Sequence, residues 1–351
     1  MINNIMKKIL ITGGAGFIGV NLAKNILGEK DNFVVIYDNL SRKGVENNLN
    51  WILSFNFPNL KFIKGDIRDY KKLKNTVKNF DEVYHLAAQV AVTSSVENPI
   101  DDFEINALGT LYLLEAIRKN SPDAVVIFSS TNKVYGELLN LKLKEGKKRY
   151  YLIKSKEGID ENQNLDFHSP YGCSKGTADQ YIRDYYRIYG LKTVVFRQSC
   201  ILGQQQYGNE DQGWVAHFII KAIEGEKINI YGDGKQVRDI LEVDDLISAY
   251  KIAVKNIKKT KGEIYNIGGG KENTFSLIEL IEYLEKVLKR KITYDFYNWR
   301  PGDQKIFISN NKKFMEETGW RIKINKFEGV NRLIKWVEKN RELIKKVREK
   351  K

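Results

Sequence analysis

Short apolar runs alternate along the chain with longer segments in which apolar residues recur at the spacing of a helix. A run such as Lys8–Thr12, rich in β-branched residues and followed by turn residues, is typical of a strand that is buried on both faces. The predicted strands are Lys8–Thr12, Phe33–Tyr37, Leu60–Ile63, Glu82–Leu86, Ala124–Ser129, Lys192–Phe196 and Glu263–Asn266. The predicted helices between them are Phe17–Leu27, Tyr70–Asn79, Asp101–Lys119 and Tyr171–Tyr189.

This alternation predicts an α/β fold whose strands form one doubly wound parallel sheet. From about Arg197 onward the alternation is less regular, which indicates a smaller C-terminal lobe that shares the chain with the sheet. We predict a first domain of residues 1–197 with about 237–268, and a second lobe of residues 198–236 and 269–351. Residues 137–166 are polar and rich in lysine, and we expect them to form a long insertion that acts as a lid or a substrate loop.

Four glycines separate the first predicted strand from the first predicted helix, namely Gly13, Gly14, Gly16 and Gly19. Glycines at such a turn allow a diphosphate to approach the backbone, where free N–H groups and the helix dipole attract it. The spacing is one residue longer than the usual dinucleotide fingerprint. Asp38 ends the second predicted strand about 20 residues further on, where a carboxylate accepts hydrogen bonds from the adenosine ribose. These features predict a Rossmann domain that binds NAD; Asp38 disfavours the 2′-phosphate of NADP, whereas Arg42 leaves it open.

Composition narrows the class of protein further. The 351 residues are 42% hydrophobic and 29% charged, which fits a globular protein with a buried core.

No apolar run reaches the length of a membrane span, and the start of the chain lacks the apolar core of a signal peptide, so we expect a cytoplasmic protein. The two cysteines match no metal-ligand spacing and only three histidines are present, so we expect no metal. The net charge of +14 is spread along the chain without a nucleic-acid module, which favours a solvated basic surface with some bias toward anionic substrates over nucleic-acid binding.

Ligands of an open α/β sheet bind beyond the carboxyl ends of its strands, so the residues that follow each strand are candidates for binding. Asp66 follows the third predicted strand, where it could meet the edge of an adenine ring. His85 ends the fourth strand and is expected to be a packed side chain, and the small residues after it would let a cofactor lie against the backbone. The fifth strand leads into a cluster of hydroxyl groups with a lysine, Ser129-Ser130-Thr131-Asn132-Lys133.

Tyr171 and Lys175 lie four residues apart at the start of a predicted helix, so their side chains project from one face. A free tyrosine has a pKa of about 10 and is a poor base at neutral pH. A neighbouring cation favours the phenolate, which could take a hydroxyl proton while a hydride leaves the same carbon for NAD. We expect Thr131 to hydrogen-bond the same hydroxyl group. The pair alone also fits a surface tyrosine beside a lysine; together with the glycine loop and the hydroxyl cluster it predicts a catalytic set.

With these motifs in this order, the chain resembles the extended short-chain dehydrogenases/reductases, and within them the NAD-dependent nucleotide-sugar epimerase/dehydratase family. The resemblance spans almost the whole chain. It rests on Gly13-Gly14-Ala15-Gly16-Phe17-Ile18-Gly19, Tyr37-Asp38-Asn39-Leu40, Gly65-Asp66-Ile67-Arg68-Asp69, His85-Leu86-Ala87-Ala88, Ser129-Ser130-Thr131, Tyr171 with Lys175, and Val237-Arg238-Asp239. Segments 129–136 and 197–201, with the insertion, look most like the CDP-tyvelose (CDP-paratose) 2-epimerases.

The resemblance implies a set of residues for each role. It assigns catalysis to Thr131, Tyr171 and Lys175. It implies that NAD stays bound and is regenerated in each turnover. The residues implied to hold NAD are Gly13, Gly16, Phe17, Ile18, Asp38, Asn39, Asp66, Ile67, Leu86, Ala87, Ala88, Gln89, Tyr171 and Lys175. It implies that a nucleotide-diphosphate sugar is held by Gln89, Thr131, Asn132, Lys133, Gln198, Asn209, Arg238 and Arg300, with the two arginines on the diphosphate. The implied reaction oxidises C2 of the sugar, lets the keto-sugar move, and returns the hydride to its other face.

Departures from the family pattern narrow the activity. Dehydratases of the family carry acidic residues directly after the catalytic threonine, whereas this chain has Asn132 and Lys133, so dehydration is disfavoured. The loop after Gly203 lacks a proline that the family pattern leads us to expect. A 4-epimerase remains an alternative because the same catalytic set would serve it, and a non-catalytic NAD-binding regulator is a third.

The resemblance also implies self-association. In the family, the helices that correspond to Asp101–Lys119 and to the Tyr171 segment pack against a partner's copies as a four-helix bundle. Apolar residues on these segments permit such packing, among them Leu111, Leu114, Tyr181 and Tyr185. We therefore expect a homodimer or a homotetramer.

Overall fold

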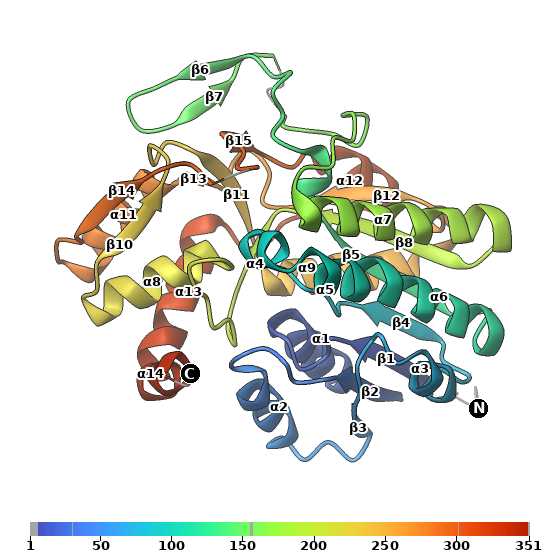
Figure 1. Cartoon of the computed structure of the whole chain (residues 1–351). Helices are drawn as coiled ribbons and strands as arrows, with labels where there is room; N and C mark the ends of the chain where they lie inside the picture. The colour runs from blue at the N-terminus through green and yellow to red at the C-terminus, as the bar shows by residue number, and fades with distance from the viewer. Residues whose placement is uncertain (1–5, 30, 155–156, 301, 350–351) are drawn as a thin grey trace.

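The computed structural model describes residues 6–29, 31–154, 157–300 and 302–349. Residues 1–5, on which the expected cytoplasmic location partly rests, lie outside the described residues. The largest element is a seven-stranded parallel sheet with the strand order β12-β8-β5-β4-β1-β2-β3 (Figure 1). Its strands are β1 (Lys7–Thr12), β2 (Asn32–Asp38), β3 (Leu60–Lys64), β4 (Glu82–His85), β5 (Val125–Thr131), β8 (Lys192–Gln198) and β12 (Ile264–Ile267). The sheet contains every predicted strand, so the predicted α/β fold is confirmed.

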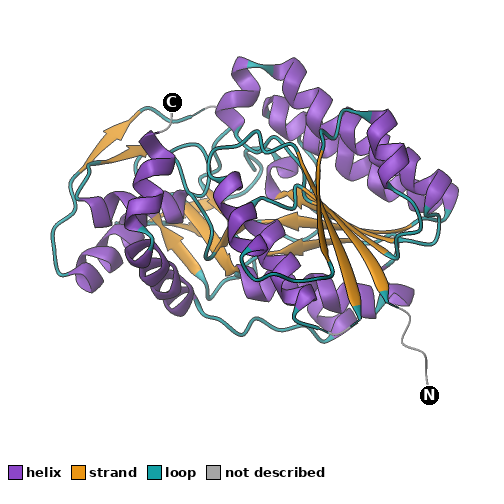
Figure 2. Ribbon diagram, turned by 90° about the horizontal axis from the view of Figure 1, so that it is seen from below, coloured by secondary structure: helices purple, strands orange, loops and turns teal. Residues whose placement is uncertain are grey.

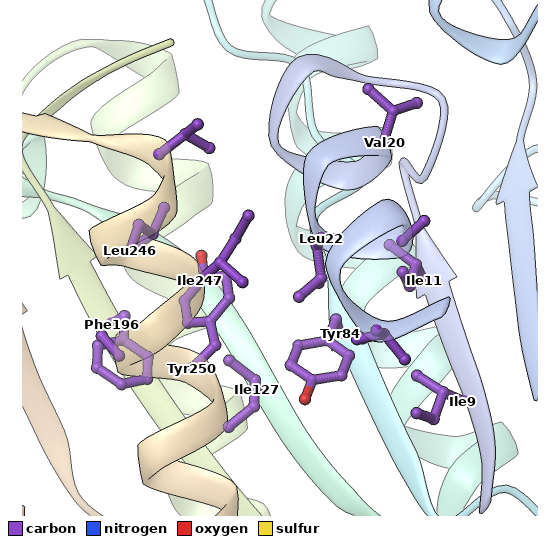
Figure 3. Close-up of a cluster of buried hydrophobic side chains, with 14 of the residues drawn as sticks. Ile9, Ile11, Val20, Leu22, Tyr84, Ile127, Phe196, Leu246, Ile247 and Tyr250 are labelled. Carbon is purple, nitrogen blue, oxygen red and sulfur yellow. The ribbon is translucent and has the colours of Figure 1, made fainter. Parts of the chain in front are cut away.

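Helices cover both faces of this sheet (Figure 2). The helices α1 (Phe17–Leu27), α2 (Val45–Leu53) and α9 (Val243–Lys255) cover one face, and α3 (Tyr70–Thr76), α6 (Gly109–Asn120) and α7 (Ser169–Tyr189) cover the other. Successive side chains of β1 point to opposite faces of the sheet. Ile9 and Ile11 pack in the core under α1, α2 and α9, and Leu10 packs in the core under α3, α6 and α7. Figure 3 shows Ile9 and Ile11 of β1 beside α1, in the same core cluster as Leu22 and Tyr84.

Two predicted helices differ from the observed ones. The segment predicted as one helix, Asp101–Lys119, consists of α5 (Pro99–Phe103), a π-helical turn η1 (Glu104–Leu108), and α6. Within η1 the Asn106 amide donates to the Gln89 carbonyl and to the carboxylate of Asp102, a tertiary arrangement that apolar periodicity does not reveal. Helix α3 ends at Thr76, before the predicted Asn79, whose backbone is left-handed with φ 54°.

The second lobe contains two small sheets. Strand β11 (Val237–Glu242) pairs with β9 (Cys200–Leu202), β13 (Thr274–Ser276) and β15 (Ile306–Phe307), and β10 (Ile228–Tyr231) pairs with β14 (Tyr294–Tyr297).

The remaining elements of the whole chain are α4 (Val92–Glu97), η2 (Asn132–Tyr135), β6 (Leu143–Glu145), β7 (Tyr150–Leu152), α8 (Trp214–Glu224), α10 (Ile257–Thr260), α11 (Leu277–Leu288), α12 (Lys312–Thr318), α13 (Lys326–Lys339) and α14 (Arg341–Glu349). Strand β11 lies with the lobe, whereas α9 and β12 after it lie with the large sheet. The exact domain boundaries stay a prediction.

The insertion forms an antiparallel hairpin, β6 and β7, that projects at the top of Figure 1. It is attached to the second lobe: the backbone N–H of Tyr150 donates to the carbonyl of Lys235 (3.1 Å), and Arg149 lies 3.4 Å from the carboxylate of Glu279. Part of the insertion, residues 155–156, lies outside the described residues.

A buried ion pair joins α7 to the large sheet. Asp179 of α7 receives two hydrogen bonds of 2.9 Å from the guanidinium of Arg197 on β8, and both side chains are almost completely buried. The hydroxyl of Ser130 on β5 donates to the same carboxylate at 2.7 Å. The pair therefore fixes the helix against two neighbouring strands.

We predict that Arg197→Met lowers the free energy of unfolding by about 3–5 kcal/mol, because it leaves the Asp179 carboxylate buried without its counter-ion. Chemical denaturation would measure the loss. In the matched control Asp295→Asn, which removes an exposed ion pair with Lys227, the loss should be about 1 kcal/mol or less. Equal losses in the two variants would show that the buried pair does not hold the helix in place.

Candidate active site

A cleft of about 650 Å³ lies between the carboxyl edge of the large sheet and the second lobe. It brings together most of the residues that the sequence singles out for cofactor, catalysis and substrate. Those that line it are Gly13, Gly16, Phe17, Ile18, Leu86, Ala88, Thr131, Asn132, Lys133, Tyr171, Lys175, Gln198, Arg238 and Arg300. Among the described residues, none of the hairpin insertion lines the cleft, so the insertion is attached beside the site instead of covering it.

The glycine loop at one end of the cleft fits a bound diphosphate. The loop is packed so closely that a Cβ on Gly13, whose φ is +67°, would lie 2.6 Å from the backbone nitrogen of Ala87. Gly16 is the N-cap of α1 and supplies no side chain, so the first-turn N–H groups of the helix face the cleft without a side-chain cap. Backbone donors at an uncapped helix N-terminus are the groups that bind phosphate.

Asp38 lies beside this loop at the end of β2. Its carboxylate accepts hydrogen bonds from the backbone N–H groups of Ala15 (3.1 Å) and Leu40 (2.8 Å). Burial raises the pKa of Asp38, and these two hydrogen bonds oppose that shift. The carboxylate is thus held in place next to the loop, as a ribose-binding acid requires.

The side chains of several other predicted binding residues contact other residues of the chain. The Asn39 amide donates to Asp66, which also forms an ion pair with Arg68. Gln89 turns back to hydrogen-bond Ala91, and the oxygen of Asn209 accepts from its own loop. Ile67 is buried in the core and Ala87 packs against the glycine loop. The binding roles of these residues stay predictions.

Tyr171 and Lys175 lie together in the first turns of α7. Burial raises the pKa of the Tyr171 phenol to about 12, and a hydrogen bond with Thr131 opposes this shift. The Lys175 ammonium donates to the carbonyl of Ser129 at 2.7 Å, and burial lowers its pKa to about 7. Strand β5 and helix α7 therefore place the hydroxyl, the phenol and the ammonium of the predicted set at one point of the cleft.

The first turns of α7 are held by hydrogen bonds to residues from earlier in the chain. Ser169 has a left-handed backbone with φ +68°, and the N–H of Tyr171 donates to the hydroxyl of Ser95 at 3.1 Å. One turn on, the hydroxyl of Ser174 donates to the buried carboxylate of Asp102. These contacts fix the backbone from which the Tyr171 side chain projects.

The substrate side of the cleft carries cations from both parts of the chain. Arg238 of β11 and Lys133 of η2 both approach Asp303, a residue that the sequence analysis did not single out. Arg300 lies 3.8 Å from the ring centroid of Tyr231 and donates to the backbone carbonyl of Glu210 at 3.0 Å. A cluster of cations along one wall is the arrangement that binds an anionic diphosphate.

Sequence reasoning missed several residues that line the cleft. They include Gln206, Glu210, His217, Tyr231 and Asp303. Gln206 and Glu210 come from the loop after Gly203 and Asp303 from the turn that carries Arg300, two places where no periodicity marks the residues, whereas His217 lies on α8 and Tyr231 on β10. His85, in contrast, is buried and hydrogen-bonded to Thr12 and Thr110, which confirms that it is a packed side chain.

Two further properties concern the described part of the chain. Its helices are too short or too polar to cross a lipid bilayer. It also contains no group of three or more histidine, cysteine or carboxylate side chains placed to hold a metal ion.

Comparison with known proteins places the chain in a family. Residues 10–333 match the family described as GDP-mannose 4,6 dehydratase, and the chain belongs to this family. The resemblance to the extended short-chain dehydrogenases/reductases that act on nucleotide sugars is thereby confirmed.

The chain is also similar to individual proteins that are named as epimerases. The chain is 45% identical to a CDP-paratose 2-epimerase of Salmonella typhi, over 94% of this chain and 98% of that protein. It is 36% identical to a putative UDP-glucose 4-epimerase of Methanocaldococcus jannaschii, over 95% and 99% of the two chains. Its fold matches a UDP-glucuronic acid 4-epimerase of Bacillus cereus, solved in complex with UDP-glucuronic acid and NAD, with a TM-score of 0.82, 27% identity, and coverage of 95% and 99%.

The burial of Lys175 predicts a pH signature. Its pKa of about 7 in the folded chain lies below the value of about 10.4 in an unfolded one, so between these values only the unfolded chain gains the proton. Its contribution to stability therefore falls as the pH decreases from about 10 to about 7 and is constant below. We predict that lowering the pH from about 10 to about 7 raises the stability of Lys175→Met, measured relative to the wild type, by on the order of 3 kcal/mol.

Denaturant unfolding of nucleotide-free protein at pH 7 and pH 10 measures this difference. The control Lys227→Met changes an exposed lysine and should show no such dependence on pH. A Lys175→Met difference that is the same at both pH values would contradict the burial of an uncharged amine.

Proposed function

We propose that this protein is an NAD-dependent epimerase of a nucleotide-diphosphate sugar, of the CDP-paratose/CDP-tyvelose 2-epimerase type. One observation carries the proposal: Thr131, Tyr171 and Lys175 share a single cleft with the glycine loop and with Arg238 and Arg300. The identity of 45% with a CDP-paratose 2-epimerase supports C2 as the carbon that is inverted.

The glycine loop, Asp38 and the small residues after β4 would hold NAD. Gly13 and Gly16 admit the diphosphate to the backbone, and the carboxylate of Asp38 accepts from the adenosine ribose. The solved relative that contains NAD supports this choice of cofactor. When bound, NAD supplies the capacity to accept a hydride from a sugar carbon and to give it back.

The chain's own residues control the proton. Tyr171 would take the proton from the sugar hydroxyl and later return it, because its phenol lies in the cleft beside Thr131. The ammonium of Lys175, one helical turn away, favours the phenolate form over the neutral phenol. Thr131 would hydrogen-bond the same sugar hydroxyl and hold it against the phenolate oxygen.

The residues after Thr131 argue against dehydration. The Asn132 amide donates to the side chain of Gln304 (3.1 Å), and Lys133 is engaged by the loop that carries Asp303. Elimination of water next to a ketone needs a general acid and a base at this place. The amide of Asn132 is neither an acid nor a base at neutral pH, and the single amine of Lys133, already engaged with Gly302 and Asp303, cannot supply both groups.

A 4-epimerase is a second candidate function. The identity of 36% with a putative UDP-glucose 4-epimerase and the match to a UDP-glucuronic acid 4-epimerase favour it. The same catalytic set would serve C4, since only the placement of the sugar ring differs. An intact set of this kind argues against a non-catalytic NAD-binding regulator.

The proposal predicts inversion without exchange. Purified protein is incubated with CDP-, UDP- and GDP-hexoses in deuterated water without added NAD, and the products are identified by proton NMR. We expect inversion at C2 of a CDP-sugar with no deuterium incorporated, because the hydride returns directly to the carbon that lost it. Inversion at C4 would favour the second candidate, and deuterium next to the inverted carbon would contradict hydride return.

Tyr171→Phe is the matched control for this experiment. It removes one hydroxyl group and should reduce turnover at least about 1,000-fold while the folded structure and the NAD content are retained. Circular dichroism and the absorbance of released cofactor check the last two points. A variant with near-full activity would exclude Tyr171 as the proton acceptor.

The family resemblance also implies self-association, which we propose as a homodimer or homotetramer. Exposed apolar side chains lie on α4, α5 and α7, namely Val96, Ile100, Phe103, Tyr181, Ile188 and Tyr189. Of the residues expected at the contact, Leu114 and Tyr185 are instead buried within the chain's own core. Sedimentation velocity should give a dimer or larger, and Ile100→Asp with Phe103→Asp should shift it to monomer; a monomeric wild type would contradict the proposal.

A further inference from the structure

Asp102 of α5 is a buried carboxylate that the proposed mechanism does not use, and only 1% of its surface is exposed. One of its carboxylate oxygens accepts from the hydroxyl of Ser174, and the other accepts from the amide of Asn106 at 3.1 Å. Both donors are neutral, and within the described part of the chain no cation forms an ion pair with Asp102. A carboxylate buried in this way is costly, so its presence needs a physical reason.

The hydrogen bonds of Asp102 lead directly to the catalytic helix. Ser174 is the residue before Lys175 on α7, and its hydroxyl oxygen also lies 3.1 Å from the amide nitrogen of Asn106. Asn106 in turn is fixed by two hydrogen bonds to the backbone of Gln89, of 3.0 Å and 3.1 Å. Helix α5, the turn η1 and the segment after β4 therefore hold the backbone next to Lys175 together.

Lys175 is the cation that lacks a direct counter-ion. Its ammonium donates to the backbone carbonyl of Ser129 at 2.7 Å, a neutral acceptor. Two carboxylates, Asp179 and Asp102, raise its pKa against the larger effect of burial. The charge of Asp179 is already offset by its ion pair with Arg197 at 2.9 Å. Of these two carboxylates, Asp102 is thus the one whose charge no ion pair offsets.

The other charged groups around Asp102 and Tyr171 do not change this picture. Asp101 on the same helix forms an ion pair with Arg68 at 2.6 Å, and its side chain is 42% exposed. Arg42 lowers the pKa of Tyr171, whereas Asp102 raises it. Because charges are weakly screened in a protein interior, the interaction of Asp102 with its neighbours does not require direct contact.

We propose that Asp102 is a positioning residue of the catalytic pair: it holds the start of α7 through Ser174, and its negative charge keeps the amine of Lys175 protonated. The inference rests on the proposed function, because it takes Lys175 as the residue that supports the phenolate of Tyr171. A neutral amine would give the phenolate no such support. The same charge disfavours the phenolate itself, so its removal should move the titration of both groups to lower pH.

Denaturant unfolding of the full chain freed of nucleotide tests the charge directly. As the pH falls, the stability of Lys175→Met relative to the wild type should stop rising near pH 7, where folded Lys175 is protonated. In an Asp102→Asn background the same comparison should level off about one pH unit lower, because the folded chain takes up that proton later. Both proteins of this second comparison carry Asp102→Asn, so its general effect on stability cancels.

Asp101→Asn is the matched control, since it removes the same charge from the next position of α5, where the side chain is partly exposed. It should leave the pH of levelling-off within about 0.3 unit. Ser174→Ala removes the hydrogen bond and keeps the carboxylate, and it should also leave this pH near that of the wild type. Asp102→Ser serves as the neutral variant if the asparagine protein does not fold. An unshifted neutral variant, or an equal shift in Ser174→Ala, would overturn the proposal.

The pH dependence of kcat for the nucleotide sugar gives a second readout. In Asp102→Asn both limbs of the profile should move to lower pH by about one unit, because Tyr171 and Lys175 lose the same neighbouring charge. A lower kcat with both limbs at their wild-type pH would show a merely structural role and would overturn the proposal.

The two experiments separate this inference from the function on which it rests, since the unfolding comparison needs neither NAD nor a sugar. If the comparison shifts but the protein turns over no nucleotide sugar, the proposed function is wrong and the interaction of Asp102 with Lys175 stands. If the protein turns over a nucleotide sugar while neither measurement shifts, only the role of Asp102 is wrong.

Discussion

The buried ion pair between Asp179 and Arg197 sets the geometry on which the candidate site depends. It connects the helix that carries Tyr171 and Lys175 to the strand next to β5, and Ser130 extends the same network into β5 itself. Ser130 precedes Thr131, so one network lies beneath the whole catalytic set. Parallel strands alone bring residues to one edge of a sheet, but they do not fix a helix against that edge to within a hydrogen-bond length.

The site combines groups whose burial opposes their charged forms. Burial raises the pKa of Tyr171 to about 12 and lowers that of Lys175 to about 7, so the folded chain favours the neutral form of both. A phenolate beside an ammonium ion is nevertheless the arrangement that proton removal requires. The chain therefore holds its reactive groups at a cost in stability, a conflict that is typical of functional sites.

The order of apolar runs was sufficient to predict the large sheet, α1 and the glycine loop, because a buried parallel strand and a surface helix each leave a local pattern. The spacing of Tyr171 and Lys175 was visible for the same reason, since both lie on one helix. The π-helical turn at Asn106 was not predictable, because its cause is a set of contacts with Gln89 and Asp102. Nor was Asp303, which gains its place only when the loop between β14 and β15 meets η2.

The central claim is that a hydride leaves one sugar carbon and returns to the same carbon from the other side. The most direct test uses a CDP-hexose deuterated at C2, incubated in ordinary water with purified protein and no added NAD. The account predicts a C2-inverted product that retains its deuterium at C2, as measured by mass spectrometry and NMR. Loss of the deuterium to water during inversion would contradict it.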